Sequence, residues 1–222
     1  MKNDEDYLTY VNDSKNSLYY LEVLAESSHD YQLIKKSFNN TGSMYSKTSN
    51  KMEVIIKNTY RIRSKNQRNV DHLSKILVFH GTPRRNVPGI LTSGFKSTEF
   101  GQFGPGVYHS NFFSKSLRYS GQKDCFIFVN ELPLKYLSEK SVEGPQDTYC
   151  CKYICSDDQQ LEEYKRDSEG GFINIAVDRI DDLPEFVASS NIVVPKYLVH
   201  AVEVKKTLVE DLVKLVILII IV

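Results

Sequence analysis

Three short segments of the chain concentrate side chains that are suited to chemistry. His80 follows a run of apolar residues, and Gly81 comes directly after it. Residues 103–119 combine glycines, tyrosines and a Ser-Lys-Ser stretch, and Glu185 follows a proline much later. Imidazole can donate or accept a hydrogen bond, a tyrosine ring can stack on a flat ligand, and a carboxylate can stabilise a developing positive charge. Taken singly, each of these residues more often has a structural use, so the functional signal lies in their combination.

Together the three segments resemble the His-Tyr-Glu signature of the poly(ADP-ribose) polymerases and tankyrases. In that family a strand ends in His-Gly-Ser/Thr, a Gly-x-Gly-x-Tyr segment leads to Ser-Lys-Ser-x-x-Tyr, and a late strand carries a glutamate. This chain contains LVFHGTPRRN, FGPGVYHSNFFSKSLRY and LPEFVASSN in the same order. The upstream segments YQLIKKSFNNT and EVIIKNTYRIR resemble the start of the same catalytic domain. The resemblance therefore covers residues 31–204.

The resemblance implies an ADP-ribosyltransferase that consumes NAD as a co-substrate and needs no metal. The reaction breaks the bond between nicotinamide and ribose through a transition state in which the ribose carbon becomes an oxocarbenium ion. The leaving group needs no proton, because it starts as a pyridinium cation. Such an enzyme must hold the nicotinamide flat and place negative charge beside the ribose, as carboxylates do in glycoside hydrolysis.

The same resemblance implies catalytic roles for Glu185, His80 and Tyr108. Glu185 would hydrogen-bond the 2′-hydroxyl of the nicotinamide ribose, stabilise the cation and help activate the acceptor hydroxyl. His80 would hold a hydroxyl of the adenosine ribose, and Tyr108 would line the nicotinamide site. Retention of the glutamate permits, without proving, the extension of ADP-ribose chains.

Five further residues are expected to bind NAD. Tyr119 would stack on the nicotinamide ring, and the Ser116 hydroxyl would hydrogen-bond the carboxamide. The backbone of Gly81 would pair with the same carboxamide, where a side chain would obstruct the close approach. Thr82 and Asn86 match positions that contact the adenosine half of NAD in relatives. The expected acceptors are protein side chains, including those of the chain itself.

The chain departs from the family pattern at several positions. Pro83 stands where many relatives carry arginine, although tankyrases share this choice. The loop KSTEFGQ is shorter than the donor loop of many relatives, and residues 188–190 replace aromatic and acidic residues. These departures support a second hypothesis, a non-catalytic module that binds ADP-ribose or a protein partner. A third hypothesis is an NAD hydrolase, which would use the same site with water as acceptor. The intact triad favours the transferase.

The elements that must position these residues are more often strands than helices, and the two do not alternate regularly. Strands are predicted over residues 53–62, 76–79, 125–132, 172–180, 185–189 and 197–204, with residues 138–171 mostly in loops. The strand over 76–79 is expected to stop at His80 before a turn. One helix is expected to follow Ser28 and to end at residues 39–43, and two short helices are expected over 85–94 and from 114 onward. This pattern favours the α+β class. The resemblance adds two antiparallel sheets around an NAD cleft, with peripheral helices.

The domain organisation follows from these elements. A lead-in segment covers residues 1–28, the catalytic domain covers 29–206, and an apolar tail covers 207–222. The uncharged run at the end of the tail is shorter than the roughly 20 residues that span a bilayer, so we expect no membrane association. A helix docked on the domain is favoured for the tail, with a weak tail anchor or residues foreign to the natural fold as alternatives.

Composition narrows the partners and the compartment. Basic and acidic residues balance at 28 each, so we expect no direct binding of nucleic acid. The polar N-terminus does not resemble a signal peptide, which favours an intracellular protein of the nucleus or cytoplasm. The cysteines are then expected to be thiols, and the spacing of Cys150, Cys151 and Cys155 fits a zinc site poorly.

Overall fold

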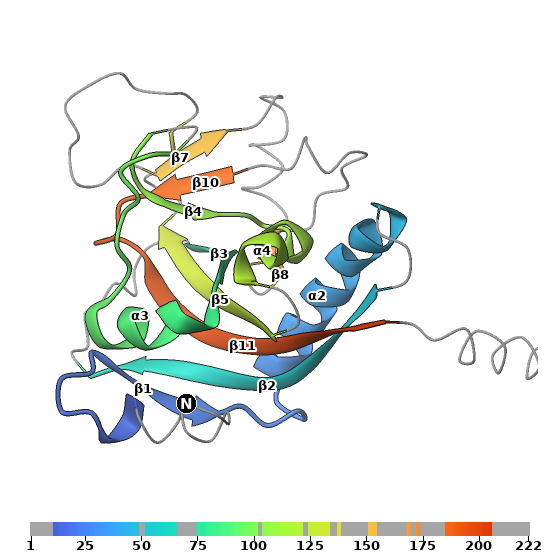
Figure 1. Cartoon of the computed structure of the whole chain (residues 1–222), viewed down its shortest axis with the longest axis horizontal. Helices are drawn as coiled ribbons and strands as arrows, with labels where there is room; N and C mark the ends of the chain where they lie inside the picture. The colour runs from blue at the N-terminus through green and yellow to red at the C-terminus, as the bar shows by residue number, and fades with distance from the viewer. Residues whose placement is uncertain are drawn as a thin grey trace, which may run out of the picture.

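Two β-sheets form the framework of the molecule in the computed structural model (Figure 1). The structure describes residues 11–48, 52–65, 75–101, 104–121, 124–133, 137–138, 151–154, 168–169, 172–173 and 185–205. The larger sheet contains, in spatial order, β1 (Tyr19–Val23), β2 (Met52–Ser64), β11 (Val194–Lys205), β5 (Asp124–Pro133), β3 (Lys75–Thr82), β9 (Phe172–Ile173) and β8 (Ser168–Glu169). The smaller sheet contains β4 (Val107–His109), β10 (Glu185–Ala188), β7 (Cys151–Ile154) and β6 (Leu137–Ser138).

Most strand pairs are antiparallel, as the family resemblance implies. The exceptions among the described strands are β3 with β9 and β6 with β7, which pair in parallel. Both exceptions involve strands of two to four residues: β9 pairs with the longer β3, and β6 and β7 pair with each other in the smaller sheet. The α+β class with two sheets is therefore confirmed, and the expectation of purely antiparallel sheets is wrong at these two pairs.

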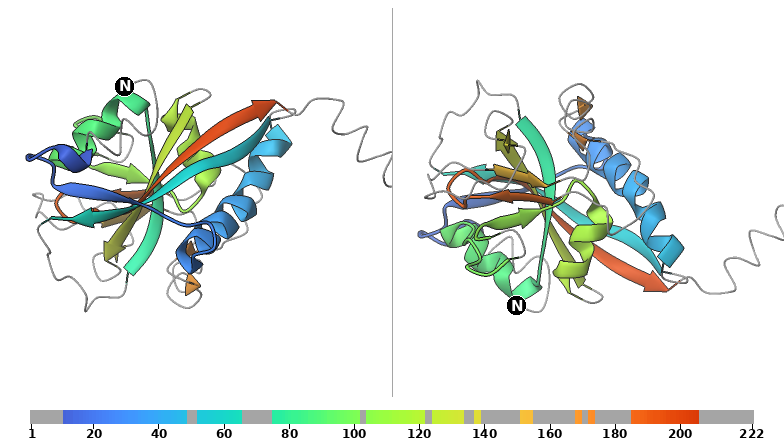
Figure 2. Two further views of the ribbon diagram at one scale, coloured as in Figure 1. Left: turned by 90° about the horizontal axis from the view of Figure 1, so that it is seen from below. Right: turned by 90° about the horizontal axis from the view of Figure 1, so that it is seen from above.

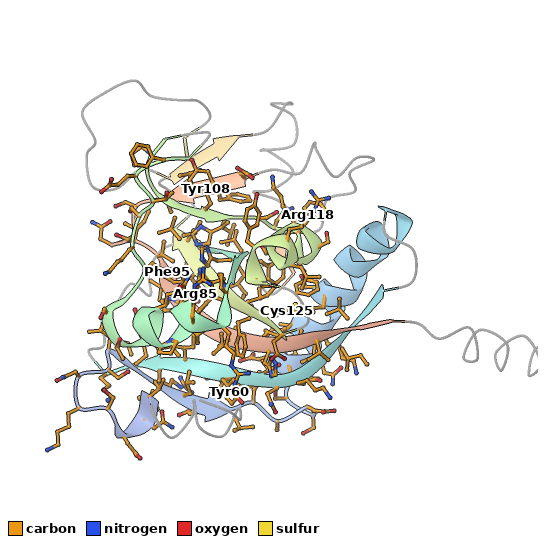
Figure 3. The ribbon with its side chains drawn as sticks, in the orientation of Figure 1. Tyr60, Arg85, Phe95, Tyr108, Arg118 and Cys125 are labelled. Atoms are coloured by element: carbon orange, nitrogen blue, oxygen red, sulfur yellow. The ribbon has the colours of Figure 1, made fainter. Side chains whose placement is uncertain are left out.

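The centre of the larger sheet is buried on both faces, which explains the continuous apolar run of β5. Phe126 and Phe128 point into one core cluster together with Leu91 of the helix α3 (Val87–Ser93). Ile127 and Val129 point into the other cluster, and successive side chains of a strand alternate between faces in this way. Helix α3 covers the first face, whereas α2 (His29–Thr48) and α4 (Phe113–Ser120) cover the second (Figure 2). Figure 3 shows the side chains that fill the space between these layers.

The first long helix begins where the sequence predicts but ends later. The Ser28 hydroxyl accepts a hydrogen bond from the Tyr31 backbone N–H at 3.3 Å, and Ile34 and Phe38 are buried as expected. The predicted end at residues 39–43 is wrong, because α2 continues to Thr48. A glycine costs only about 1 kcal/mol relative to alanine inside a helix, and adding residues to a formed helix is easier than starting one.

The short helix after β3 matches its prediction closely. Val87, Ile90 and Leu91 are buried on one face, and a proline occupies the first turn. Gly94 ends the helix with φ at 82°, and its N–H donates to the carbonyl of Ile90 at 2.8 Å. The short turn η1 (Arg84–Asn86) leads into this helix.

Other strand predictions are confirmed in part. The expected stop at His80 is wrong, because β3 continues to Thr82 and keeps pairing with β5 up to Phe126. Strand β1 was not predicted, and of the strand expected over 172–180 the structure describes only β9. Strand β7 lies within the predicted loop region. The tail from 207 to 222, the first ten residues and the side chains of Cys150, Cys151 and Cys155 lie outside the described part. No helix in the described part is long and apolar enough to cross a membrane.

A polar cluster fastens α2 to the larger sheet. The Asp30 carboxylate accepts hydrogen bonds from Arg61 of β2 at 2.5 Å and from the Tyr197 hydroxyl of β11 at 2.7 Å. Burial tends to raise the pKa of Asp30, but the hydrogen bonds from Tyr197 and Arg61 and the charge of Arg61 outweigh it, so this pKa is lowered. Burial and the same carboxylate raise the pKa of Tyr197. The cluster therefore holds an ionised carboxylate against two donors.

Candidate active site

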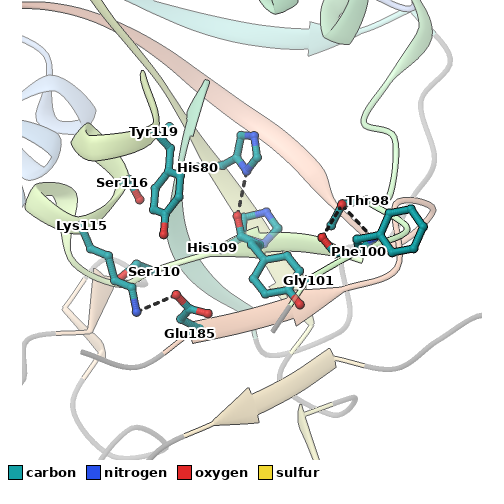
Figure 4. Close-up of a pocket in the computed structure, with 12 residues that line it drawn as sticks. His80, Thr98, Phe100, Gly101, His109, Ser110, Lys115, Ser116, Tyr119 and Glu185 are labelled. Carbon is teal, nitrogen blue, oxygen red and sulfur yellow. Dashed lines mark hydrogen bonds and ion pairs between the residues drawn. The ribbon is translucent and has the colours of Figure 1, made fainter. Parts of the chain in front are cut away.

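A cavity of about 390 Å³ lies where the two sheets meet (Figure 4). Its walls are formed by His80, Gly81, Thr98, Phe100, Gly101, Tyr108, His109, Ser110, Lys115, Ser116, Tyr119 and Glu185. Six of the eight residues predicted from the sequence are in this set. The other two, Thr82 and Asn86, do not line the cavity; the Asn86 side-chain amide donates to the Thr82 hydroxyl at 3.3 Å.

Four elements and the loop before β4 supply the walls, and one backbone bridge joins two of these elements, β3 and β4. Strand β3 supplies His80, β4 supplies Tyr108, α4 supplies Tyr119 and β10 supplies Glu185. Next to these residues, the Phe79 N–H donates to the Ser110 carbonyl at 2.6 Å, and the Ser110 N–H donates back at 2.9 Å. This bridge connects the larger sheet to the smaller one through β3 and the end of β4.

Strand β3 and helix α4 approach so closely that only a glycine fits between them. A Cβ atom on Gly81 would lie 1.7 Å from the backbone oxygen of Ser116, which is far inside van der Waals contact. The Ser116 hydroxyl donates its proton to the Phe79 carbonyl at 2.9 Å. In this arrangement its oxygen can only accept a hydrogen bond from a ligand. From the sequence, we expect a glycine at position 81 because a ligand approaches its backbone closely. The structure shows a second reason, the packing of α4 against β3.

The ring of His80 is fixed in one neutral tautomer. Its Nδ1 lies 2.8 Å from the Tyr108 carbonyl, which can only accept, so the proton is on Nδ1 and the Nε2 lone pair is left over. Burial lowers the pKa of His80 more than this hydrogen bond raises it. His80 therefore presents a hydrogen-bond acceptor to the cavity near neutral pH.

The Tyr108 ring is held under the loop that precedes it. Its hydroxyl donates to the Gly104 carbonyl at 2.6 Å, and Thr98 and Gly106 close the loop with a pair of backbone hydrogen bonds. A Cβ atom on Gly101 would lie 2.1 Å from the Tyr108 hydroxyl oxygen, so a glycine is needed where the loop crosses the ring. The position of Tyr108 is thus set by the protein itself.

Glu185 places a carboxylate on the wall opposite His80 (Figure 4). Its Oε1 lies 2.7 Å from the Lys115 ammonium group, and the two side chains are 16% and 17% exposed. A mostly buried ion pair at this distance is held strongly in place because little solvent screens it. Tyr119 stands on the rim of the same cavity with 62% of its surface exposed, which leaves its ring accessible to a flat ligand.

The comparison with protein families shows the family of the chain. The model of the poly(ADP-ribose) polymerase catalytic domain matches residues 28–165, which is more than half of the chain. The chain belongs to this family. Among curated proteins, none matches the sequence. The match includes His80, Tyr108 and Tyr119, whereas Glu185 lies beyond it and is brought to the same cavity by the pairing of β10 with β4.

Poly(ADP-ribose) polymerase catalytic domains use NAD as a substrate, and the cavity offers groups that suit it. A carboxylate, a neutral imidazole and an exposed aromatic ring converge on one space, as a sugar and a flat cationic ring require. The described residues contain no group of three potential metal ligands. The side chains that line the cavity can bind and orient a ligand and stabilise charge on it.

Six residues that line the cavity received no role from the sequence, and two of them, Lys115 and His109, carry titratable side chains. Lys115 belongs to the quoted Ser-Lys-Ser stretch but received no role, although its spacing of four from Tyr119 places both on one side of α4. His109 follows Tyr108 on β4 and is 3% exposed. The signal in the sequence was a second histidine directly after the tyrosine of the motif.

Proposed function

We propose that this chain is an NAD-dependent protein ADP-ribosyltransferase that transfers ADP-ribose from NAD to protein side chains and releases nicotinamide. The observation that carries the proposal is the Glu185 carboxylate, which lines the same cavity as His80 and Tyr119 and is held 2.7 Å from Lys115. A carboxylate in this setting supplies the negative charge that an oxocarbenium ion needs.

The nicotinamide end of NAD is bound between the helix and the strands. Tyr119 stacks on the pyridinium ring, a contact worth about 0.5–1.5 kcal/mol beyond the area it buries. The Ser116 hydroxyl accepts a hydrogen bond from the carboxamide N–H, since it donates its own proton to the Phe79 carbonyl. The Gly81 backbone pairs with the same carboxamide. Tyr108 lines the opposite side. These contacts keep the leaving group flat while the bond to ribose lengthens.

The ribose groups are held by the acid and the imidazole. Glu185 accepts a hydrogen bond from the 2′-hydroxyl of the nicotinamide ribose and stabilises the cation that forms as nicotinamide departs. The acceptor hydroxyl then attacks the ribose carbon, and its proton passes to the carboxylate. His80 accepts from a hydroxyl of the adenosine ribose through Nε2. Thr82 and Asn86 contact the adenosine half beyond the cavity.

The acceptor is a protein side chain, including those of the chain itself. Retention of the glutamate supports repeated transfer, and hence poly(ADP-ribose) polymerase activity, over transfer of a single unit. The balanced charge of the chain supports an activity that does not use nucleic acid as acceptor.

Labelled NAD tests the proposal. Wild-type protein is incubated with NAD labelled in the adenosine part, and protein-bound label and free nicotinamide are both measured. The variant is Glu185→Gln, and the matched control is Glu131→Gln, because Glu131 is also 16% exposed and pairs with Lys75 and Lys196 outside the cavity. We expect Glu185→Gln to lower labelling at least about 100-fold, and the control to label normally for each folded molecule.

Each alternative hypothesis gives a different result. Nicotinamide release without protein label, in the presence of acceptor protein, indicates an NAD hydrolase. If wild type and Glu185→Gln are equally inactive while NAD or ADP-ribose raises the melting temperature, the chain is a binding module. A ladder of labelled products establishes elongation, and a single labelled band establishes single transfer.

A further inference from the structure

His109 lines the cavity, and a hydrogen bond at one of its two ring nitrogens fixes the orientation of its ring. Its Nδ1 lies 3.3 Å from the carbonyl of Phe186, the residue opposite it on β10. A carbonyl only accepts, so the Nδ1 atom carries the proton and the Nε2 atom carries a lone pair. The ring is therefore the same neutral tautomer as that of His80, and the two ring centroids are 5.6 Å apart.

The Nε2 atom of His109 has no hydrogen-bond partner within the described part of the protein, although it is buried. Other buried polar atoms there also lack partners, but among the residues that carry them His109 is the one that lines the cavity. A buried acceptor without a donor costs free energy, so a partner is expected from the space that the residue lines. Burial and the neighbouring His80 lower the pKa of His109 to about 3, which keeps the lone pair available in neutral solution.

We infer that His109 is a specificity-determining residue of this cavity: its Nε2 accepts a hydrogen bond from a donor of the bound ligand, an amide N–H or a sugar hydroxyl. The inference rests on the proposed function, because NAD offers both kinds of donor. With His80, the cavity then presents two neutral acceptors side by side. Ligands that lack a donor at this position leave the His109 lone pair unpaired and bind less tightly.

Two substitutions separate the lone pair from the shape of the ring. His109→Phe keeps a ring of similar size and removes the acceptor. His109→Gln places an amide oxygen near the position of Nε2 and keeps an acceptor. His200→Phe is the matched control, because His200 is also buried, at 5% exposure, but lies on β11 against Asp124 and outside the cavity.

Four ligands identify the donor, and isothermal titration calorimetry measures each dissociation constant. NAD tests the whole site, nicotinamide carries the amide donor alone, and ADP-ribose carries the sugar donors without nicotinamide. The fourth ligand, 3-acetylpyridine, has the shape of nicotinamide without an N–H. We expect His109→Phe to weaken the binding of NAD about 3- to 10-fold, which corresponds to one neutral hydrogen bond. His109→Gln should restore most of the lost affinity. The His200→Phe control binds like wild type.

The fragment results then locate the donor. If His109→Phe loses affinity for nicotinamide but not for 3-acetylpyridine, the donor is the amide. If it loses affinity for ADP-ribose, the donor is a hydroxyl. If His109→Phe binds NAD with the affinity of wild type, the lone pair has no role and the inference is overturned. The inference is also overturned if His109→Gln loses as much affinity for NAD as His109→Phe. If wild type binds none of NAD, nicotinamide and ADP-ribose, the proposed function fails as well.

The experiment remains decisive if His109→Phe does not fold. His109→Asn keeps a donor for the Phe186 carbonyl and removes the acceptor at the Nε2 position, and it is measured with the same ligands. Melting temperatures of all variants show whether binding is compared between folded proteins. Equal affinity of His109→Asn and wild type for NAD would likewise overturn the inference.

Discussion

Two polar clusters in this molecule use their hydrogen-bonding capacity differently. At the start of α2, the donors of Arg61 and Tyr197 converge on the Asp30 carboxylate, and the cluster closes on itself. At the cavity, His80 and His109 each donate one hydrogen bond to a carbonyl and keep one lone pair. The first cluster joins elements, whereas in the second the Nε2 atom of His109 has no partner within the described part of the protein.

The contrast teaches how to separate structural from functional polar residues in a fold. Satisfied polar groups contribute to stability and to the choice of one arrangement. Oriented but unsatisfied groups reduce stability, and they are expected where a ligand completes the hydrogen bonding. Substitutions in the two regions should therefore affect stability and ligand binding to different extents.

The largest expected effect comes from Gly81→Ala at the cavity. The added Cβ would lie 1.7 Å from the backbone oxygen of Ser116, so β3 and α4 must separate. We expect a loss of more than about 3 kcal/mol in the free energy of unfolding, measured by urea denaturation, because backbone atoms cannot rotate out of the way.

Gly89→Ala is the control for this substitution. Gly89 is inside α3, and apart from its chain neighbours and the backbone of its own helix no described atom lies within 4 Å of a Cβ placed there. Alanine should stabilise the protein by about 0.5–1 kcal/mol at this position. Equal stability of the two variants would show that β3 and α4 do not pack as described.

A smaller effect is expected from Asp30→Asn in the closed cluster. The variant loses the charge that Arg61 and Tyr197 share, and we expect a loss of about 1–3 kcal/mol in unfolding free energy at pH 7, discounted because the side chain is 30% exposed. NAD binding by the folded fraction should be unchanged. Glu22→Gln, which breaks a pair with Arg63 that is 43–47% exposed, should cost at most about 1 kcal/mol. A change in NAD affinity for Asp30→Asn would contradict the division between the two clusters.

The most gradual effect is the pH dependence of stability that the cavity histidines produce. The folded protein lowers the pKa of His80 and His109 below 6.5, so the unfolded chain binds more protons and stability falls as the pH drops through 6.5. Because the pKa of His109 is lowered to about 3, this residue should contribute a slope that approaches about 1.4 kcal/mol per pH unit below 6.5, and His109→Phe should remove that contribution. Asp30 also has a lowered pKa, but its contribution is lost only below about 3.8. Denaturation curves between pH 7 and 5 measure the slopes, and identical slopes for the two proteins would contradict the burial of a neutral His109.

The sequence predicts best those elements whose pattern is local. The short helix before Gly94 and the strand β5 carry their own signals, an apolar face with a terminal glycine and a continuous apolar run. The end of α2 was mispredicted because turn residues there are outweighed by a helix already in progress. Strand β1 has no strong pattern of its own and forms because β2 offers it a paired edge from Tyr60 to Ser64.

The sequence predicts which residues line the cavity better than it predicts the contacts between them. The motifs brought His80, Tyr108 and Glu185 to attention, and the structure places all three around one cavity. No motif indicates that the Tyr108 carbonyl fixes the tautomer of His80, since this depends on the spacing between β3 and β4. The role of Lys115 and the unpaired atom of His109 likewise follow from contacts between segments far apart in the sequence.

The bridge between Phe79 and Ser110 constrains how the two sheets can move. His80 lies one residue beyond this bridge on β3, and His109 lies one residue before it on β4. A rotation of one sheet against the other that preserves these two hydrogen bonds has its pivot beside both histidines. Displacements grow with distance from a pivot, so such a rotation would move the two imidazoles less than residues far from the bridge. The two hydrogen bonds that join the sheets thus also hold the two acceptors at a nearly constant separation.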